Sequence, residues 1–256
     1  MSFVIANIHS MDAHPVFPLQ LGDLGVVVSE TLTIFSLTDV FIILSLLINT
    51  FVWKYKSRKM EDIVNKRCGW AGTDGLYVKY HDEEWGKLVT DDKTLFEFLV
   101  LESAQAGLAW ITILRKREGY KKAFYNFDVE KVAAMTSDDI DRLMLFDGIV
   151  RNRLKIASTI TNARCFIAIQ KEFGSFYNYT LSFFPEQKPI VNNFKSLKEI
   201  PVTTPESDVM SKDMKKRGFK FFGSTICYAH MQATGFVNDH LEGCLCKEKI
   251  LTDGPV

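Results

Sequence analysis

Apolar residues recur at intervals of three and four along much of the chain, which is the period of an amphipathic α-helix. The clearest stripe follows Asp91 and Asp92, either of which can cap a helix N-terminus, and contains Leu95, Phe98, Leu99, Ala106, Ala109 and Trp110. The same spacing predicts helices over residues 129–135, 140–146, 153–173, 207–222 and 225–234. Strand patterns are weak, and the proline-rich residues 185–205 are expected to form a connection without regular structure. We therefore predict an all-α domain with roughly six or more helices around one core.

The N-terminal extension has a different pattern. Residues 31–53 are almost wholly apolar and are followed by a basic cluster, Lys54, Lys56, Arg58 and Lys59. This stretch is a possible membrane helix, but it reaches the ~20 residues that a span needs only if Asp39 lies within it. The alternative is that translation starts at Met60 and that the upstream residues are an artefact. We accordingly divide the chain into an extension (1–59), a globular domain (60–248) and a tail (249–256), and expect a cytoplasmic protein, with anchoring through 31–53 as the alternative.

Charge and cysteine content limit the possible partners. Lys and Arg number 31 and so do Asp and Glu, so there is no overall basic field, and any nucleic-acid binding must use a local basic face. Five cysteines are an odd number and lack the dense spacing of a disulfide framework. They favour a reducing compartment or a metal site.

Glu102 is the only charged member of the stripe that starts at Leu95. Burying an unpaired carboxylate is costly and raises its pKa, so such a group is either paired for structure or placed for function. Aromatic residues are dense in the preceding segment, and Trp70, Trp85 and Trp110 all lie within about 40 residues of one another. Planar rings can stack on a nucleobase, and a cationic purine adds a cation–π attraction, although core packing explains any single ring equally well.

Two cysteine–histidine pairs lie at opposite ends of the predicted domain. Cys68 and His81 are near its start, and His240 and Cys244 are near its end. Two sulfur and two imidazole ligands suit tetrahedral zinc, and four protein ligands would make that zinc structural, because no position is left for water. The spacing alone leaves other cysteines and histidines as alternatives, namely Cys246, His230 and Cys227.

A short glycine-containing turn separates two predicted helices at residues 147–153. Its backbone N–H groups, around Gly148, and the N-terminus of the next helix can hold a phosphate, with Arg151 or Arg153 adding charge. A second basic run could follow a DNA strand or could be an ordinary solvated helix face; it comprises Lys212, Lys215, Lys216, Arg217 and Lys220.

Six segments carry a resemblance to a known family: RCGW at 67–70, YHDEEWG at 80–86, LESAQAGLAWITILRKRE at 101–118, GIVRNRLKI at 148–156, KKRGFKFFGSTICY at 215–228 and VNDHLEGC at 237–244. In this order they resemble the DNA-3-methyladenine glycosylase I family over residues 66–246. The resemblance implies a helix–hairpin–helix fold that bends double-stranded DNA containing alkylated adenine and flips the damaged nucleotide. It further implies hydrolysis of the N-glycosidic bond without cutting the backbone, and so no lyase activity.

The resemblance also implies individual roles. Glu102 would be the catalytic residue that hydrogen-bonds the excised base, Tyr80 would contact its edge, Trp110 would stack on its face, and Trp70 would complete the pocket. The family pattern implies that one structural Zn²⁺ is held by Cys68, His81, His240 and Cys244. It implies no obligate protein partner, and we expect a monomer. Asp208 and Asp213 lie where related glycosylases of other types have a catalytic aspartate, but this pattern gives them no role.

Two rival hypotheses belong to other classes. One is a zinc-stabilised protein that binds DNA or nucleobases on the same scaffold without turnover. The other is a Cys–His hydrolase built on Cys227 and His230, whose spacing on one helix supplies no orienting third group.

Overall fold

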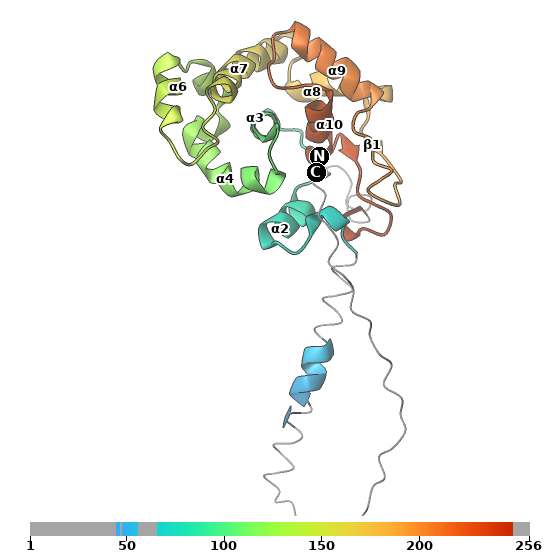
Figure 1. The fold of residues 1–256 in the computed structure, drawn as a ribbon. Coiled ribbons are helices and arrows are strands. Elements are labelled where there is room, and N and C mark those ends of the chain that lie inside the picture. Colours follow the sequence, from blue (N-terminus) through green and yellow to red (C-terminus); the bar gives the residue numbers. More distant parts are fainter. Residues whose placement is uncertain (1–44, 47, 56–65, 248–256) are drawn as a thin grey trace, which may run out of the picture. The chain divides into compact units, whose positions relative to one another are not determined.

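The computed structural model describes residues 45–46, 48–55 and 66–247, which fall into two compact units (Figure 1). Residues 45–46 and 48–55 are helical and exposed. Among the described residues, no helix combines the length and the apolar character that crossing a bilayer requires. Most of the predicted membrane stretch 31–53, Met60 and the tail 249–256 lie outside the described residues, so these expectations remain predictions.

Residues 66–247 form a predominantly helical unit, as the periodicity predicts. Its α-helices are α2 (Gly75–Glu83), α3 (Asp92–Gln105), α4 (Trp110–Ala123), α5 (Val129–Ala133), α6 (Ser137–Met144), α7 (Arg153–Phe173), α8 (Phe176–Leu181), α9 (Pro205–Lys216) and α10 (Ser224–Ala233). Three 3-10 turns are η1 (Gly69–Ala71), η2 (Tyr125–Phe127) and η3 (Pro185–Gln187). The short strands β1 (Ile190–Val191) and β2 (Val237–Asn238) pair in parallel, with Ile190 opposite Val237 and Val191 opposite Asn238.

Helix α3 lies at the centre of this unit and packs against α4, α7, α8 and α10. Asp91 caps its N-terminus by accepting hydrogen bonds from the backbone N–H groups of Lys93 and Thr94. Ten of its fourteen residues are buried, so the helix is enclosed on all sides and is not a surface helix with one apolar face. The helix ends at Gln105, and the predicted stripe that continued to Trp110 is therefore divided between α3 and α4.

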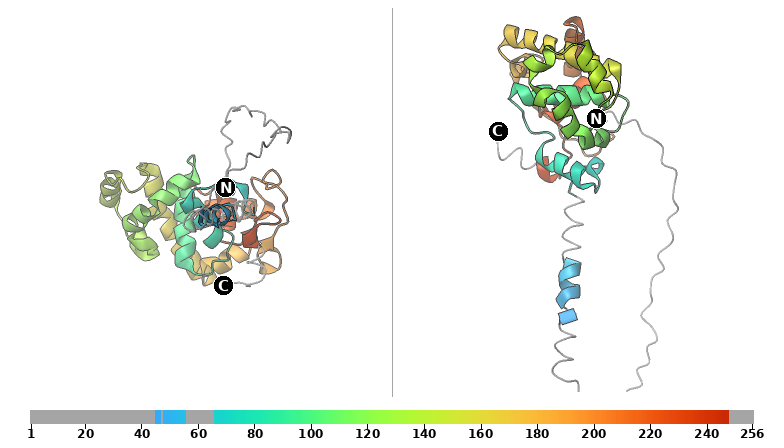
Figure 2. Two further views of the ribbon diagram at one scale, coloured as in Figure 1. Left: turned by 90° about the horizontal axis from the view of Figure 1, so that it is seen from below. Right: turned by 90° about the vertical axis from the view of Figure 1, so that its left-hand side faces the viewer.

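Two groups of helices flank α3. Figures 1 and 2 show α4, α6 and α7 on one side and α9, α10 and β1 on the other. The first part of the unit, around α2, lies beside the last part, around β2, although they are at opposite ends of the sequence (Figure 2). This arrangement brings the two predicted cysteine–histidine pairs to the same place.

The turn between α6 and α7 is held against α4 by a close backbone approach. A Cβ atom added to Gly119 of α4 would lie 2.0 Å from the carbonyl oxygen of Gly148. A Cβ atom at Gly148 would in turn lie 2.4 Å from the ring of Phe146. Only two glycines allow this contact, and it fixes the turn relative to α4.

Replacing Gly119 with alanine should therefore destabilise the protein, although alanine is the better helix former. We expect Gly119→Ala to lower the free energy of unfolding by roughly 1–3 kcal/mol, because the backbone of the turn must move. Urea denaturation measures this change. Gly75→Ala is the matched control, since a Cβ at that helix position meets no atom within 4 Å. A stabilising effect of Gly119→Ala equal to that of the control would contradict the close approach.

Candidate active site and metal centre

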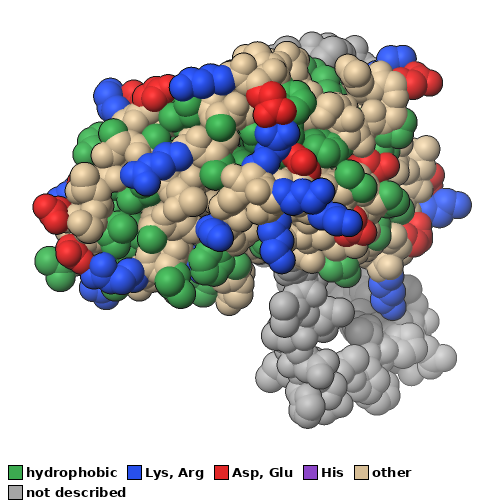
Figure 3. Space-filling model, turned by 90° about the horizontal axis from the view of Figure 1, so that it is seen from above, with side chains coloured by type: hydrophobic (Ala, Val, Ile, Leu, Met, Phe, Trp, Pro, Cys, Tyr) green, Lys and Arg blue, Asp and Glu red, His purple; other side chains and the backbone are tan. Residues whose placement is uncertain are grey.

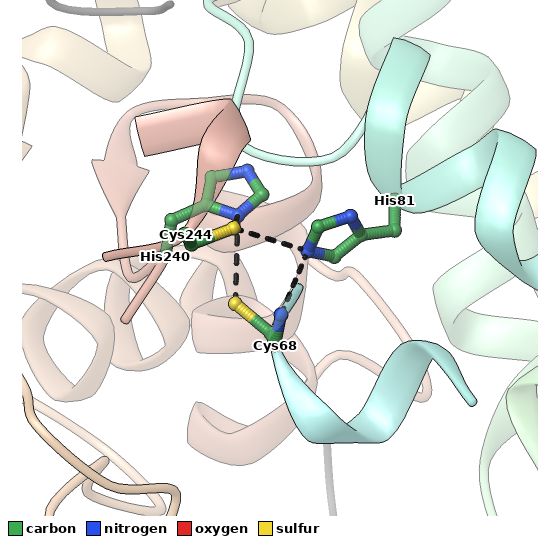
Figure 4. Close-up of side chains that lie close together, drawn as sticks. All are labelled: Cys68, His81, His240 and Cys244. Atoms are coloured by element: carbon green, nitrogen blue, oxygen red, sulfur yellow. Dashed lines mark hydrogen bonds between the residues drawn. The ribbon is translucent and has the colours of Figure 1, made fainter. Parts of the chain in front are cut away.

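Four buried side chains from the two ends of the helical unit meet in one cluster (Figure 4). Cys68 precedes η1, His81 is in the last turn of α2, and His240 and Cys244 follow β2. One ligand atom from each of the four lies within 4.8 Å of the others. The structure thus brings together the four residues that the resemblance assigns to zinc.

The distances within the cluster suit a tetrahedral metal. The Cys244 Sγ atom lies 3.5 Å from His81 Nε2 and 3.4 Å from His240 Nδ1, and Cys68 Sγ lies 3.6 Å from His240 Nδ1. Zinc bonds of about 2.3 Å to sulfur and about 2.0 Å to nitrogen place sulfur and nitrogen about 3.5 Å apart in a tetrahedron. The four residues therefore have the spacing that zinc requires.

Both histidines also have the proton arrangement of metal ligands. His81 Nδ1 lies 2.8 Å from a carboxylate oxygen of Asp82, and His240 Nε2 lies 2.9 Å from the backbone carbonyl of Trp85. Because these oxygens can only accept, both nitrogens must donate. The other nitrogen of each neutral imidazole, His81 Nε2 and His240 Nδ1, therefore carries a lone pair that faces the sulfurs. Asp82 is itself held by Arg67, whose Nε and Nη2 donate to it at 2.8–3.0 Å.

The alternative ligands lie outside this group of four. The Cys246 Sγ atom is 3.7 Å from His81 Nδ1, the nitrogen that faces Asp82, so it contacts the outer side of the cluster. His230 Nε2 donates a hydrogen bond to the backbone carbonyl of Leu95 at 3.1 Å, and the side chain is packed in the core. Burial lowers the pKa of His230 to about 4 and raises the pKa of Cys227 above its usual range, which disfavours the charged thiolate–imidazolium pair of a Cys–His hydrolase.

Glu102 is buried in α3, with 4% of its surface exposed. Burial raises the pKa of its carboxyl group from 4.5 to about 7. Among residues 66–247 no lysine or arginine pairs with it; the nearby Arg117 pairs instead with Glu84 and Glu97. The anomaly in the apolar stripe is thus a carboxyl group that has no ion-pair partner within residues 66–247.

Aromatic rings lie between the region of Glu102 and the cysteine–histidine cluster. The ring centroid of Trp70 lies 5.4 Å from that of Tyr77 and 6.2 Å from that of Tyr80. The ring centroids of Tyr80 and Trp110 are 5.3 Å apart. Burial, and then the charge of Glu102, raises the pKa of Tyr77 to about 12 and that of Tyr80 well above 10. The indole Nε1 of Trp110 is buried and has no hydrogen-bond partner within the described part of the chain. The structure therefore groups Trp70, Tyr80, Glu102 and Trp110 at one place.

Two tryptophan rings contact the histidines of the cysteine–histidine cluster directly. The ring of Trp70 meets His81 edge-on at 5.1 Å, and Trp85 meets His240 edge-on at 4.6 Å. The two tryptophans also contact each other at 5.0 Å. Movement of either histidine would consequently displace the aromatic cluster.

The turn at residues 147–152 joins α6 to α7, as the sequence pattern predicts. Asn152 caps α7 by accepting a hydrogen bond from the backbone N–H of Lys155 at 3.1 Å. Arg151 is exposed and is free of ion pairs among residues 66–247, whereas Arg153 forms an ion pair with Asp141. Arg151 is therefore available to a phosphate, but Arg153 must first leave Asp141.

The second basic run is exposed only in part. Arg217 is held by Glu172 and Asp213, while the four lysines of the run, Lys212, Lys215, Lys216 and Lys220, are exposed. Figure 3 shows lysine and arginine side chains interspersed with acidic ones on one face of the unit.

Comparison with known proteins agrees with this geometry. A family model described as methyladenine glycosylase matches residues 70–247. A DNA-3-methyladenine glycosylase 1 of Escherichia coli K12 is 51% identical over 181 residues, which are 71% of this chain and 96% of the relative. A DNA-3-methyladenine glycosylase of Haemophilus influenzae is 47% identical over 181 residues, covering 71% and 97%.

The chain belongs to the methyladenine glycosylase family. A solved 3-methyladenine DNA glycosylase I of Staphylococcus aureus has a similar fold, with a TM-score of 0.69 and 38% identity over 72% of this chain and 97% of the other. The resemblance inferred from the six motifs is confirmed, and so is the mostly helical fold. Members of this family are enzymes that act as N-glycosylases.

Three residues of this glycosylase fold escaped the sequence analysis. Lys155 hydrogen-bonds the carbonyls of Ala104 and Ala106 at the end of α3. Leu108, in the turn between Glu102 and Trp110, is 38% exposed. Gly119 makes the backbone contact described above. Lys155 and Leu108 lie within the motifs at 148–156 and 101–118, and their place in these motifs indicates a role near the site. No pattern in the sequence indicates which residue Gly119 contacts.

The raised pKa of Glu102 predicts a pH-dependent stability difference between the wild-type glycosylase and Glu102→Gln. The folded protein keeps a proton that the unfolded chain releases, so this stabilisation is present below about pH 4.5 and is lost as pH rises through 7. The glutamine side chain of the variant does not titrate, so the variant does not lose stability in this way as pH rises. Between pH 5 and pH 8 the free energy of unfolding of the variant should rise by roughly 2 kcal/mol relative to wild type.

Urea denaturation of both proteins across this pH range measures the difference. Protonation of the cysteine–histidine cluster is common to the two proteins and cancels. A difference that stays constant from pH 5 to pH 8 would show that Glu102 has an ordinary pKa.

Proposed function

We propose that this protein excises 3-methyladenine from double-stranded DNA by hydrolysing the N-glycosidic bond. The observation that carries the proposal is the buried carboxyl group of Glu102, which lacks an ion pair among residues 66–247 and whose charge acts on Tyr80, a ring in contact with Trp70 and Trp110. Relatives at 51% and 47% identity are named as DNA-3-methyladenine glycosylases, and the related Staphylococcus aureus structure concerns 3-methyladenine recognition.

A cationic base offers the buried carboxyl group the partner that it lacks. Burial disfavours the charged form of Glu102, and a positive charge nearby favours it, so binding of 3-methyladenine in DNA should lower the pKa of this group. Neutral adenine offers no such compensation. Glu102 would then discriminate by charge, Tyr80 would contact the base edge, and Trp110 would stack on the face, with a cation–π attraction to the cationic purine.

The reaction itself needs little acid catalysis. Methylation at N3 leaves the base positively charged, so it departs with the electron pair of the broken C1′–N9 bond as neutral 3-methyladenine. Water adds its oxygen to C1′ and releases a proton to solvent. The protein supplies selection of the base, an environment for the oxocarbenium-like sugar and access for water.

Reaching the pocket requires that the nucleotide leave the base stack. Flipping a nucleotide costs a few kcal/mol, and the cost is lowest when the base is damaged. The exposed Leu108 lies in the turn that joins the Glu102 helix to Trp110, where an apolar side chain can fill the space left in the duplex. Gly148 and Arg151 would hold a backbone phosphate at the start of α7.

We infer that the enzyme has no lyase activity. A lyase uses a free lysine amine as nucleophile, and Lys155, which lies at the end of α3, is engaged by two carbonyl oxygens. Its Nζ atom is thus occupied as a hydrogen-bond donor.

We also propose that Cys68, His81, His240 and Cys244 hold one structural Zn²⁺. The distances, the burial and the two outward hydrogen bonds of the imidazoles all suit this ion. Four protein ligands leave no position for substrate, so the ion would stabilise the fold and take no part in the reaction.

The first test replaces Glu102. Glu102→Gln keeps the shape of the side chain but removes its charge, so excision from methylated duplex DNA should fall by about a hundredfold and binding of free 3-methyladenine should weaken. Chromatography of released base measures excision. Glu118→Gln removes an exposed carboxylate of α4 and should behave as wild type. Excision by Glu102→Gln at the wild-type rate would overturn the assigned role.

The second test concerns the metal. Elemental analysis of the purified protein by mass spectrometry should find about one zinc ion per chain. Cys244→Ser should lose zinc and lower the melting temperature, because a ligand of the cluster is gone. Cys246→Ser should retain it, since that sulfur lies on the outer side of His81. Loss of zinc in both variants, or in neither, would contradict the proposed ligand set.

A further inference from the structure

The side chain of Lys155 links α7 to the end of α3. Its Nζ atom donates hydrogen bonds to the carbonyl oxygens of Ala104 at 2.9 Å and Ala106 at 2.6 Å. The backbone of Lys155 is also fixed, because its N–H donates to Asn152 Oδ1 and its carbonyl accepts from the hydroxyl of Ser158. Lys155 is therefore held at both ends.

The contact supplies what α3 lacks at its C-terminus. The last carbonyl groups of a helix have no partner within the helix, and the negative end of its dipole favours a cation. No basic residue lies in the last turn of α3. Among residues 66–247 no carboxylate pairs with Lys155, and burial lowers its pKa. Its ammonium group is thus directed at these carbonyls alone.

The carbonyls that Lys155 holds belong to a tight turn. Leu108 donates its N–H to the carbonyl of Gln105 at 2.6 Å. Ala106 has φ −42° and ψ 114°, and Gly107 has φ +79°, which are the angles of a type II turn with glycine at its third position. The turn carries the exposed Leu108 and leads directly to Trp110, the first residue of α4. The position of the turn therefore determines where the exposed Leu108 lies relative to Glu102, whereas Trp110 is also held by its ring contact with Tyr80.

We propose that Lys155 is a positioning residue that couples the phosphate-binding hairpin to the turn carrying Leu108. The inference rests on the proposed function, in which the hairpin holds the DNA backbone. Asn152 caps α7 at the hairpin, and Lys155 lies in the first turn of the same helix. The first turn of α7 thus fixes both the position of the DNA backbone on the protein and the end of α3. The lesion and Leu108 are thereby placed opposite each other.

The test separates excision from base binding. Lys155→Met keeps much of the aliphatic stem but removes all donors, whereas Lys155→Arg retains the charge and the donors. Lys171→Met is the matched control, because that lysine is exposed on the same helix. For each protein, excision from methylated duplex DNA is measured at saturating enzyme in a single turnover. Binding of free 3-methyladenine is measured separately, well below the melting temperature.

Lys155→Met should slow excision by about tenfold or more, because small misplacements near the reacting centre have large effects on rate. Its affinity for the free base should stay within about threefold of wild type. Lys155→Arg should recover most of the rate, and Lys171→Met should match wild type.

Two results would overturn the coupling role. One is an excision rate of Lys155→Met within about twofold of wild type. The other is an equal loss of excision and free-base binding, which would mark a residue that merely maintains the pocket. If wild-type protein itself releases no 3-methyladenine, the proposed function fails, and this outcome is distinct from failure in the variants alone.

Discussion

The contact between the two ends of the helical unit determines where the rings of Trp70 and Tyr80 lie. Cys68 and His240 are 172 residues apart, and their side chains meet at 3.6 Å. Trp70 follows Cys68 by two positions and Tyr80 directly precedes His81, so closing the cluster places both rings. Because a preformed site rarely exists in an unfolded chain, metal binding here would supply folding free energy and position the aromatic residues at once.

A second constraint follows from the enclosure of α3. A helix buried on all sides offers a carboxyl group no water, so Glu102 is either protonated or compensated by a ligand of opposite charge. The surrounding rings can stack on such a ligand without neutralising the carboxylate. In the proposed function, selectivity for a cationic purine over its neutral parent would thus follow from the place of one side chain in the core. The protein needs no elaborate set of acids and bases for this purpose.

The sequence predicted the features that depend on local pattern. Helix α7 begins and ends where its periodicity does, and Glu102 is buried as its place in the stripe required. Features that depend on distant contacts were less accessible. The period continues through Ala106 and does not reveal the turn that ends α3. Cysteine spacing alone left Cys246 open as a ligand, and the close approach of Gly119 to the hairpin has no local signal.

A crystal structure of the protein with bound 3-methyladenine, recorded with anomalous data at the zinc edge, tests the central claim most directly. The account predicts one zinc peak between Cys68, His81, His240 and Cys244. It also predicts the base within hydrogen-bond distance of Glu102, with its face against Trp110. A base bound elsewhere, or a pocket that forms unchanged around a cluster without metal, would contradict the account.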